Sequence, residues 1–155
     1  MNHYLTKISI SLMILALVSL TALTVLAHTR PIHLVEHGTL TPVPNQQGHF
    51  TAEGTGTATH LGSIIVHRTL SLTPATDGSG LMDVEGEATL VAPNGDELRT
   101  GLEGTLNPAT GHAVLVYEWE GGTGRFQNAT GMTTWQVDVN TDGTYDVVAD
   151  GVIKY

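Results

Sequence analysis

The sequence of 155 residues contains no cysteine. This absence excludes disulfide bonds, thiol catalysis and zinc sites built from cysteine. Positive charge is also scarce, because 6 Lys and Arg residues stand against 15 Asp and Glu residues and leave a formal net charge of -9. A nucleic-acid-binding protein needs a basic surface against the phosphates, so we expect no nucleic-acid partner. The same deficit argues against a polybasic lipid-binding patch.

Only one long hydrophobic run is present, and it lies near the N-terminus. Residues 8–26 contain no charged side chain and follow the single positive charge of Lys7. Small residues occupy the last and third-last positions of a cleavage site that ends at Ala27. The pattern predicts a secretory signal peptide over residues 1–27 and therefore a secreted or periplasmic protein. The run is also about as long as a membrane-spanning helix, so an uncleaved membrane anchor is the alternative.

Residues 28–155 are expected to form a single domain, since their length can supply a core without disulfides. They show no sustained helical period of apolar residues. Turn signals rich in Gly, Asn, Asp and Pro recur at residues 44–48, 59–62, 76–80, 93–95, 107–111, 121–124 and 141–143. Short segments rich in Thr, Val, Leu and Ile lie between them. This spacing predicts an all-β fold, an eight-stranded antiparallel up-and-down β-barrel, with a β-sandwich as the alternative.

One hairpin is specific enough to predict its register. Apolar residues alternate with polar ones on both sides of the turn at residues 93–95. Both apolar rows share a face only if Leu90 lies opposite Leu98. That register places Glu85 opposite Glu103 on the outer face, where we expect both carboxylates to be solvated.

Two segments depart from this alternation. Residues 63–66 and 113–117 are apolar on both faces, although a barrel strand has one face inside and one outside. Both faces are apolar where something covers the outside. The alternatives are an oligomer interface, packing by a terminal segment, and a strand under a loop.

The most specific string is Gly-Gly-Thr-Gly-Arg-Phe-Gln-Asn-Ala-Thr-Gly at residues 121–131. A glycine-rich loop binds phosphate ahead of a helix, but the flanks here are strand-like, so we assign it no nucleotide. Its glycines suit a sharp corner with positive φ, Phe126 an apolar plug, and its small residues close packing. The predicted structural residues are Gly121, Gly122, Gly124, Arg125, Phe126, Ala129 and Gly131.

This string resembles the glycine signature of the allene oxide cyclase and dirigent barrel superfamily, and small secreted bacterial members of unknown function most of all. Further matches lie at residues 56–62, 94–98 and 151–155. The resemblance implies an eight-stranded antiparallel barrel with an interior pocket, often trimeric. In that superfamily, cyclases fold an unsaturated epoxide toward ring closure and dirigent proteins orient phenoxy radicals. No catalytic residue of either group maps onto the string, so we transfer no active site.

Candidate metal ligands are dispersed. His33 and His37 would lie about 13 Å apart on one strand face, too far for a shared metal. His28, as a new N-terminus, could chelate copper, but no third ligand is evident. Residues 138–146 imitate a calcium loop and lack its final glutamate, so we predict a hairpin turn there. We therefore expect no metal and no cofactor.

The sequence does not identify a catalytic residue. Glu118, between two aromatic residues, is a candidate acid or base, although the outer face of its strand is the favoured place for it. The favoured function is a secreted, non-enzymatic barrel that binds a small apolar ligand in its interior. The alternatives are an isomerase or cyclase that uses the same pocket, and an oligomeric structural protein of the envelope.

Overall fold

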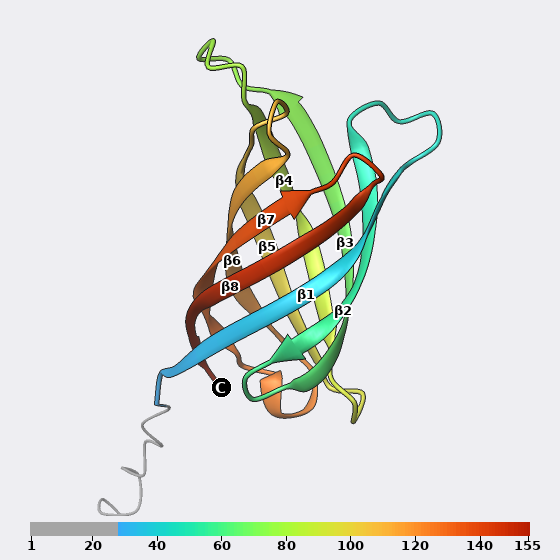
Figure 1. Ribbon diagram of the computed structural model, residues 1–155. Helices are drawn as coiled ribbons and strands as arrows, with labels where there is room; N and C mark the ends of the chain where they lie inside the picture. The colour runs from blue at the N-terminus through green and yellow to red at the C-terminus, as the bar shows by residue number, and fades with distance from the viewer. Residues whose placement is uncertain (1–27) are drawn as a thin grey trace, which may run out of the picture.

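The computed structural model describes residues 28–155, and the predicted signal peptide lies outside the described residues. Eight antiparallel strands close into a barrel in which each strand pairs with its neighbours in sequence and β8 pairs with β1 (Figure 1). The strands are β1 (Arg30–Pro42), β2 (His49–Ala58), β3 (Gly62–Pro74), β4 (Met82–Val91), β5 (Glu97–Leu106), β6 (His112–Gly122), β7 (Thr130–Val139) and β8 (Thr144–Lys154). This confirms the predicted barrel and rules out the sandwich.

The register of the β4–β5 hairpin is the predicted one. Leu90 lies opposite Leu98, and Glu85 lies opposite Glu103. The alternation of apolar and polar residues explains this register, because the inner row of both strands is buried and the outer row faces water. The glycine-rich turn differs slightly from expectation, since Gly121 and Gly122 still belong to β6 and the chain turns afterwards, through the 3₁₀ helix η1 (Gly124–Phe126).

The two ends of the barrel differ. We call the end that carries the turns at residues 43–48, 75–81, 107–111 and 140–143 the open end. We call the opposite end, with the turns at residues 59–61, 92–96 and 123–129, the closed end. In Figure 1 the open end is at the top, and the C-terminus lies near the closed end.

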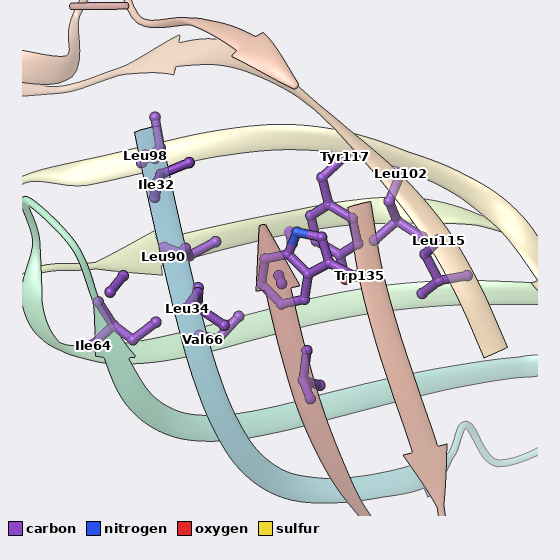
Figure 2. Packing of buried hydrophobic residues seen from close by; sticks show 14 of the residues in the cluster. Ile32, Leu34, Ile64, Val66, Leu90, Leu98, Leu102, Leu115, Tyr117 and Trp135 are labelled. Atoms are coloured by element: carbon purple, nitrogen blue, oxygen red, sulfur yellow. The ribbon is translucent and has the colours of Figure 1, made fainter. Parts of the chain in front are cut away.

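Large aliphatic side chains fill the half of the barrel near the closed end. Figure 2 shows them pointing inward from several strands. Ile32, Leu34, Ile64, Val66, Leu90, Leu98 and Ile153 are each at most 3 % exposed. This dense packing supplies much of the hydrophobic stabilisation of the fold, at about 25 cal/mol per Å² of apolar surface buried.

The glycine-rich segment closes this end. Phe126 is fully buried, and its ring meets Tyr155 edge-on at 5.1 Å between centroids. Gly124 has a φ of 54°, and an added Cβ there would strike the carboxylate of Asp96. Gly122 instead allows β6 to approach β5 closely, because a Cβ at this position would strike the carbonyl oxygen of Glu97 on β5. Both glycines are thus required by local geometry.

The two segments that are apolar on both faces do place apolar residues outside. Ile65 on β3 is 50 % exposed and Val114 on β6 is 44 % exposed. Within residues 28–155 the structure has no helix long and apolar enough to cross a lipid bilayer.

Gly122→Ala should destabilise the protein by about 1–3 kcal/mol, because the new methyl group overlaps a backbone carbonyl that cannot move alone. Gly101→Ala is the matched control on the neighbouring strand, since a Cβ there would approach only the flexible carboxylate of Glu120. Urea denaturation of both variants measures the difference. Equal stabilities would contradict the close-approach explanation.

Candidate functional site

A buried ion pair crosses the middle of the barrel. Glu36 points inward from β1 and Arg68 from β3, and they are 5 % and 6 % exposed. The Arg68 guanidinium donates from Nη1 to Glu36 Oε1 at 2.6 Å and from Nη2 to Oε2 at 2.5 Å. Such a two-pronged, charge-assisted pair is the strong form of a salt bridge. It compensates two charges that would be very costly to bury alone.

Two phenols complete the hydrogen bonding of this pair. Arg68 donates from Nε to the Tyr117 hydroxyl at 2.7 Å and from Nη1 to the Tyr145 hydroxyl at 2.8 Å. Tyr145 in turn donates to Glu36 Oε1 at 2.7 Å. We call these four residues, Glu36, Arg68, Tyr117 and Tyr145, the polar layer. These hydrogen bonds join the four side chains into one connected layer across the interior.

Trp135 packs against the polar layer. Its indole stacks on the Tyr117 ring with 4.0 Å between centroids and 8° between planes (Figure 2). The Arg68 guanidinium carbon lies 5.0 Å from the centre of the Trp135 ring, within cation–π range. The indole N–H donates to the Thr133 hydroxyl at 2.7 Å. These contacts hold the Tyr117 ring in one orientation.

Small residues on neighbouring strands make room for the layer. Gly38 on β1 lies directly opposite Gly54 on β2. A Cβ at Gly54 would overlap the Glu36 carboxylate, and one at Gly38 would overlap the Tyr145 hydroxyl. From Ala52 onward the inward residues of β2 are all alanine or glycine, namely Ala52, Gly54, Gly56 and Ala58, and the larger Phe50 precedes them near the open end. Alternation of small and large inward residues is how a narrow barrel fits bulky groups.

The environment keeps Arg68 charged and the two phenols neutral. Burial opposes the charge of Arg68, but the hydroxyls and the Glu36 carboxylate outweigh it and raise the pKa of Arg68. Burial also raises the pKa of the Tyr117 phenol, with Arg68 only partly offsetting it. The pKa of the Tyr145 phenol is raised for the same reason, burial first. Both phenols are thus neutral hydrogen-bonding groups at neutral pH.

On the open side of the polar layer lies a small cavity of about 50 Å³. The floor is formed by Arg68, Tyr117 and Tyr145, and the walls are aliphatic. The wall residues are Leu40, Ala52, Leu70, Leu72, Val84, Leu106, Ala113, Leu115, Val137, Val139 and Val147. Those nearest the open end are only partly buried: Leu40, Leu72, Leu106 and Val139. We call this space the open-end cavity.

Backbone hydrogen bonds tie the rim turns to the cavity wall. Leu40 N donates to Gly143 O at 2.8 Å, and Leu72 N donates to Gly48 O at 2.8 Å. Val139 N donates to Gly111 O at 2.9 Å. The turns at the open end are therefore positioned by the same residues that line the cavity.

Four histidines, His33, His37, His67 and His112, lie on the outer face of the barrel and pair with carboxylates across neighbouring strands. Nδ1 to carboxylate distances are 2.7 Å for His33 with Asp150, 3.0 Å for His37 with Asp146, 2.5 Å for His67 with Glu53 and 2.8 Å for His112 with Asp138. Each pair is largely exposed and so contributes little stability. Among residues 28–155, no three His, Asp or Glu side chains converge as metal ligands.

The predicted hairpin at residues 138–146 is confirmed, since β7 and β8 flank a turn at residues 140–143. Asp142 serves that turn rather than pointing at a shared centre. Its Oδ1 accepts from the backbone N–H of Thr144 at 2.9 Å and from the Thr144 hydroxyl at 2.7 Å.

Glu118 lies on the exposed outer face, as favoured for it, and does not enter the interior. It lines a shallow acidic groove of about 770 Å³ together with Glu85, Glu87, Glu103 and Glu120. The inward carboxylate is Glu36, which sequence reasoning missed. The signal for Glu36 was its position in the strand pattern, because it lies in the same inward-facing row as Ile32, Leu34 and Leu40. Arg68 likewise lies in the same row as Ile64, Val66 and Leu70.

No protein-family model matches this sequence, and no curated protein matches it. Among solved structures, the chain is similar to the pterocarpan synthase dirigent protein GePTS1 with a TM-score of 0.53 and 16 % sequence identity. The superposition covers 83 % of this chain and 86 % of that chain. The protein therefore has a dirigent-like barrel fold, as the glycine-rich segment indicated. At this identity the likeness concerns the fold alone.

Glu36→Gln should lower the free energy of unfolding by about 3–5 kcal/mol, because it leaves the buried charge of Arg68 without its counter-ion. Adding Arg68→Met removes that charge, so the double variant should be more stable than Glu36→Gln alone. Guanidinium denaturation of both variants provides the comparison. A single variant within about 1 kcal/mol of wild type would show that the pair is not energetically coupled.

The raised pKa values of Tyr117 and Tyr145 predict alkaline instability. Their stabilising effect is present below the ordinary phenol pKa of about 10 and is lost as pH rises above it, because the unfolded chain ionises first. Thermal melting from about pH 8 to about pH 11 should show a steeper fall for wild type than for Tyr117→Phe. Parallel curves would mean that the Tyr117 phenol ionises equally in both states.

Proposed function

We propose that this protein binds a small apolar molecule in the open-end cavity. The observation that carries the proposal is the construction of that cavity, with aliphatic walls above a floor whose polar groups hydrogen-bond to one another. A ligand there gains from apolar burial against the walls. Small barrels of this size commonly hold one small ligand in the mouth.

The cavity volume limits how such a ligand sits. About 50 Å³ admits only a few water molecules when the rim side chains are in their present positions. We infer that a ligand inserts one hydrocarbon end and that Leu40, Leu72 and Leu106 rearrange around it. Partly buried leucines at the end of a barrel can change rotamer at less cost than those of the closed half.

Binding is favoured over isomerase or cyclase chemistry by the state of the polar layer. Its two phenols are held neutral, and Glu36 is held by Arg68 and Tyr145. A general acid or base works best with a pKa near the operating pH. The raised phenol pKa values therefore support positioning and rigidity rather than proton transfer.

An oligomeric structural protein is the second candidate, and the exposed apolar residues favour it. Val35 on β1 and Val148 on β8 lie opposite each other and are 41 % and 48 % exposed, with Ile65 exposed nearby on β3. Apolar side chains on neighbouring strands are typical of a face that a partner covers. Native mass spectrometry reports the oligomeric state and any retained small molecule in one measurement.

Ala113→Val tests the binding proposal by adding apolar volume inside the cavity. We expect n-hexanol to shift the methyl NMR signals of Leu40, Leu72 and Leu106 in wild type, and this binding to weaken about tenfold or more in the variant. Ala109→Val is the matched control, because Ala109 is exposed in the turn at residues 107–111.

The signals of Leu90 and Leu98, in the closed half, should stay in place during the titration. If the signals of Leu40, Leu72 and Leu106 do not move with n-hexanol in wild type, the cavity does not bind apolar ligands.

A further inference from the structure

The two ends of the barrel differ in charge as well as in packing. Residues 28–155 contain five Arg or Lys side chains. Four of them are exposed, and all four belong to the closed end: Arg30 begins β1, Arg99 lies near the start of β5, Arg125 lies in η1, and Lys154 ends β8. The fifth, Arg68, is buried and neutralised by Glu36. No exposed Lys or Arg is therefore present at the open end of the described chain.

The rim of the open-end cavity is correspondingly negative. Its turns carry two charged side chains, Asp77 and Asp142, and both are exposed. Hydrogen bonds from Ser79 and Thr144, respectively, lower the pKa of each carboxyl, so both are ionised at neutral pH. Asp142 directly precedes Gly143, whose carbonyl oxygen holds the backbone of the wall residue Leu40. The turn that carries the Asp142 carboxylate is thus joined to the cavity wall.

The floor of the cavity carries no uncompensated charge for the charged end of a ligand. The Arg68 guanidinium, the one cation of the floor, is paired with the Glu36 carboxylate and also donates to Tyr117 and Tyr145. A ligand carboxylate that entered would lose its water and meet a cation whose charge is already compensated, which is unfavourable. A ligand that enters with a hydrocarbon end leaves its polar head at the rim, in the field of the carboxylates.

We propose that the open-end cavity selects amphiphiles with a hydrocarbon end and a positively charged head, and discriminates against carboxylates of the same shape. This rests on the proposed function, and it names the ligand class: alkyl amines rather than fatty-acid-like anions. The selection comes from the separation of charge between the two ends of the barrel together with a floor whose one cation is already paired with Glu36.

Three probes with the same six-carbon chain test this on the wild-type chain: n-hexylamine, n-hexanol and hexanoate. At about pH 8 the amine probe and the carboxylate probe both carry their full charge. We expect affinity to fall in the order amine, alcohol, carboxylate, with about a tenfold or greater difference between amine and carboxylate at low salt. The methyl signals of Leu72 and Leu106 report binding. At about 500 mM NaCl the amine should lose its advantage over the alcohol.

The variant pair Asp77→Asn with Asp142→Asn removes the rim charges and keeps oxygen acceptors for the turns. It should bring the amine and carboxylate affinities closer together and leave hexanol unchanged. Asp150→Asn is the matched control, because this exposed carboxylate pairs with His33 on the outer wall, away from the rim turns.

Each outcome is decisive. Equal affinities for the three probes in wild type, or a preference for hexanoate, would overturn the charge selection while leaving apolar binding intact. A preference for the amine that survives the rim substitutions would also overturn it, since the carboxylates named here would not be its source. Failure of all three probes to bind would instead refute the proposed function.

Discussion

The ion pair between Glu36 and Arg68 is the constraint around which the interior is arranged. The two residues do not lie on neighbouring strands, because β2 separates β1 from β3. Their side chains meet only by passing over the inner face of β2, which explains why that face carries only alanine and glycine from Ala52 to Ala58. Burying two charges is costly unless geometry and hydrogen bonding are both good, and the phenols of Tyr117 and Tyr145 supply the remaining partners. The pair therefore dictates residues on at least four strands.

The polar layer also separates two regions with different packing. On one side, the closed half is filled by large aliphatic residues, and its turn is sealed by Phe126. On the other side, partly buried leucines and valines surround a small space that continues to solvent. The densely packed half can supply the stability of the fold, while the residues of the other half are packed less tightly. The polar layer lies between the two regions.

The sequence predicted the parts of the structure that depend on local pattern. The turns recur where Gly, Asn and Asp cluster, and the β4–β5 register followed from matching apolar rows. The interior chemistry was missed because it depends on strands that are distant in sequence: Tyr145 meets Glu36 only after the barrel closes between β8 and β1. The alternating pattern placed Glu36 and Arg68 in phase with apolar neighbours. A single strand does not reveal which acidic residue pairs with which basic residue. Closure is a property of the whole sheet, so the pairing could not be derived from either segment alone.

The location of the glycine-rich segment explains why a recognisable fold carried so little information about function. Residues 121–131 form the corner at the closed end, where glycines are required by backbone carbonyls and a positive φ. The cavity lies at the opposite end, beyond the polar layer, and residues of the open half line it. A corner motif constrains strand connection and closure, whereas the ligand choice that we propose would depend on the inward residues and rim turns of the other end. The two sets share no residue, so the scaffold can be kept while the chemistry at the open end changes.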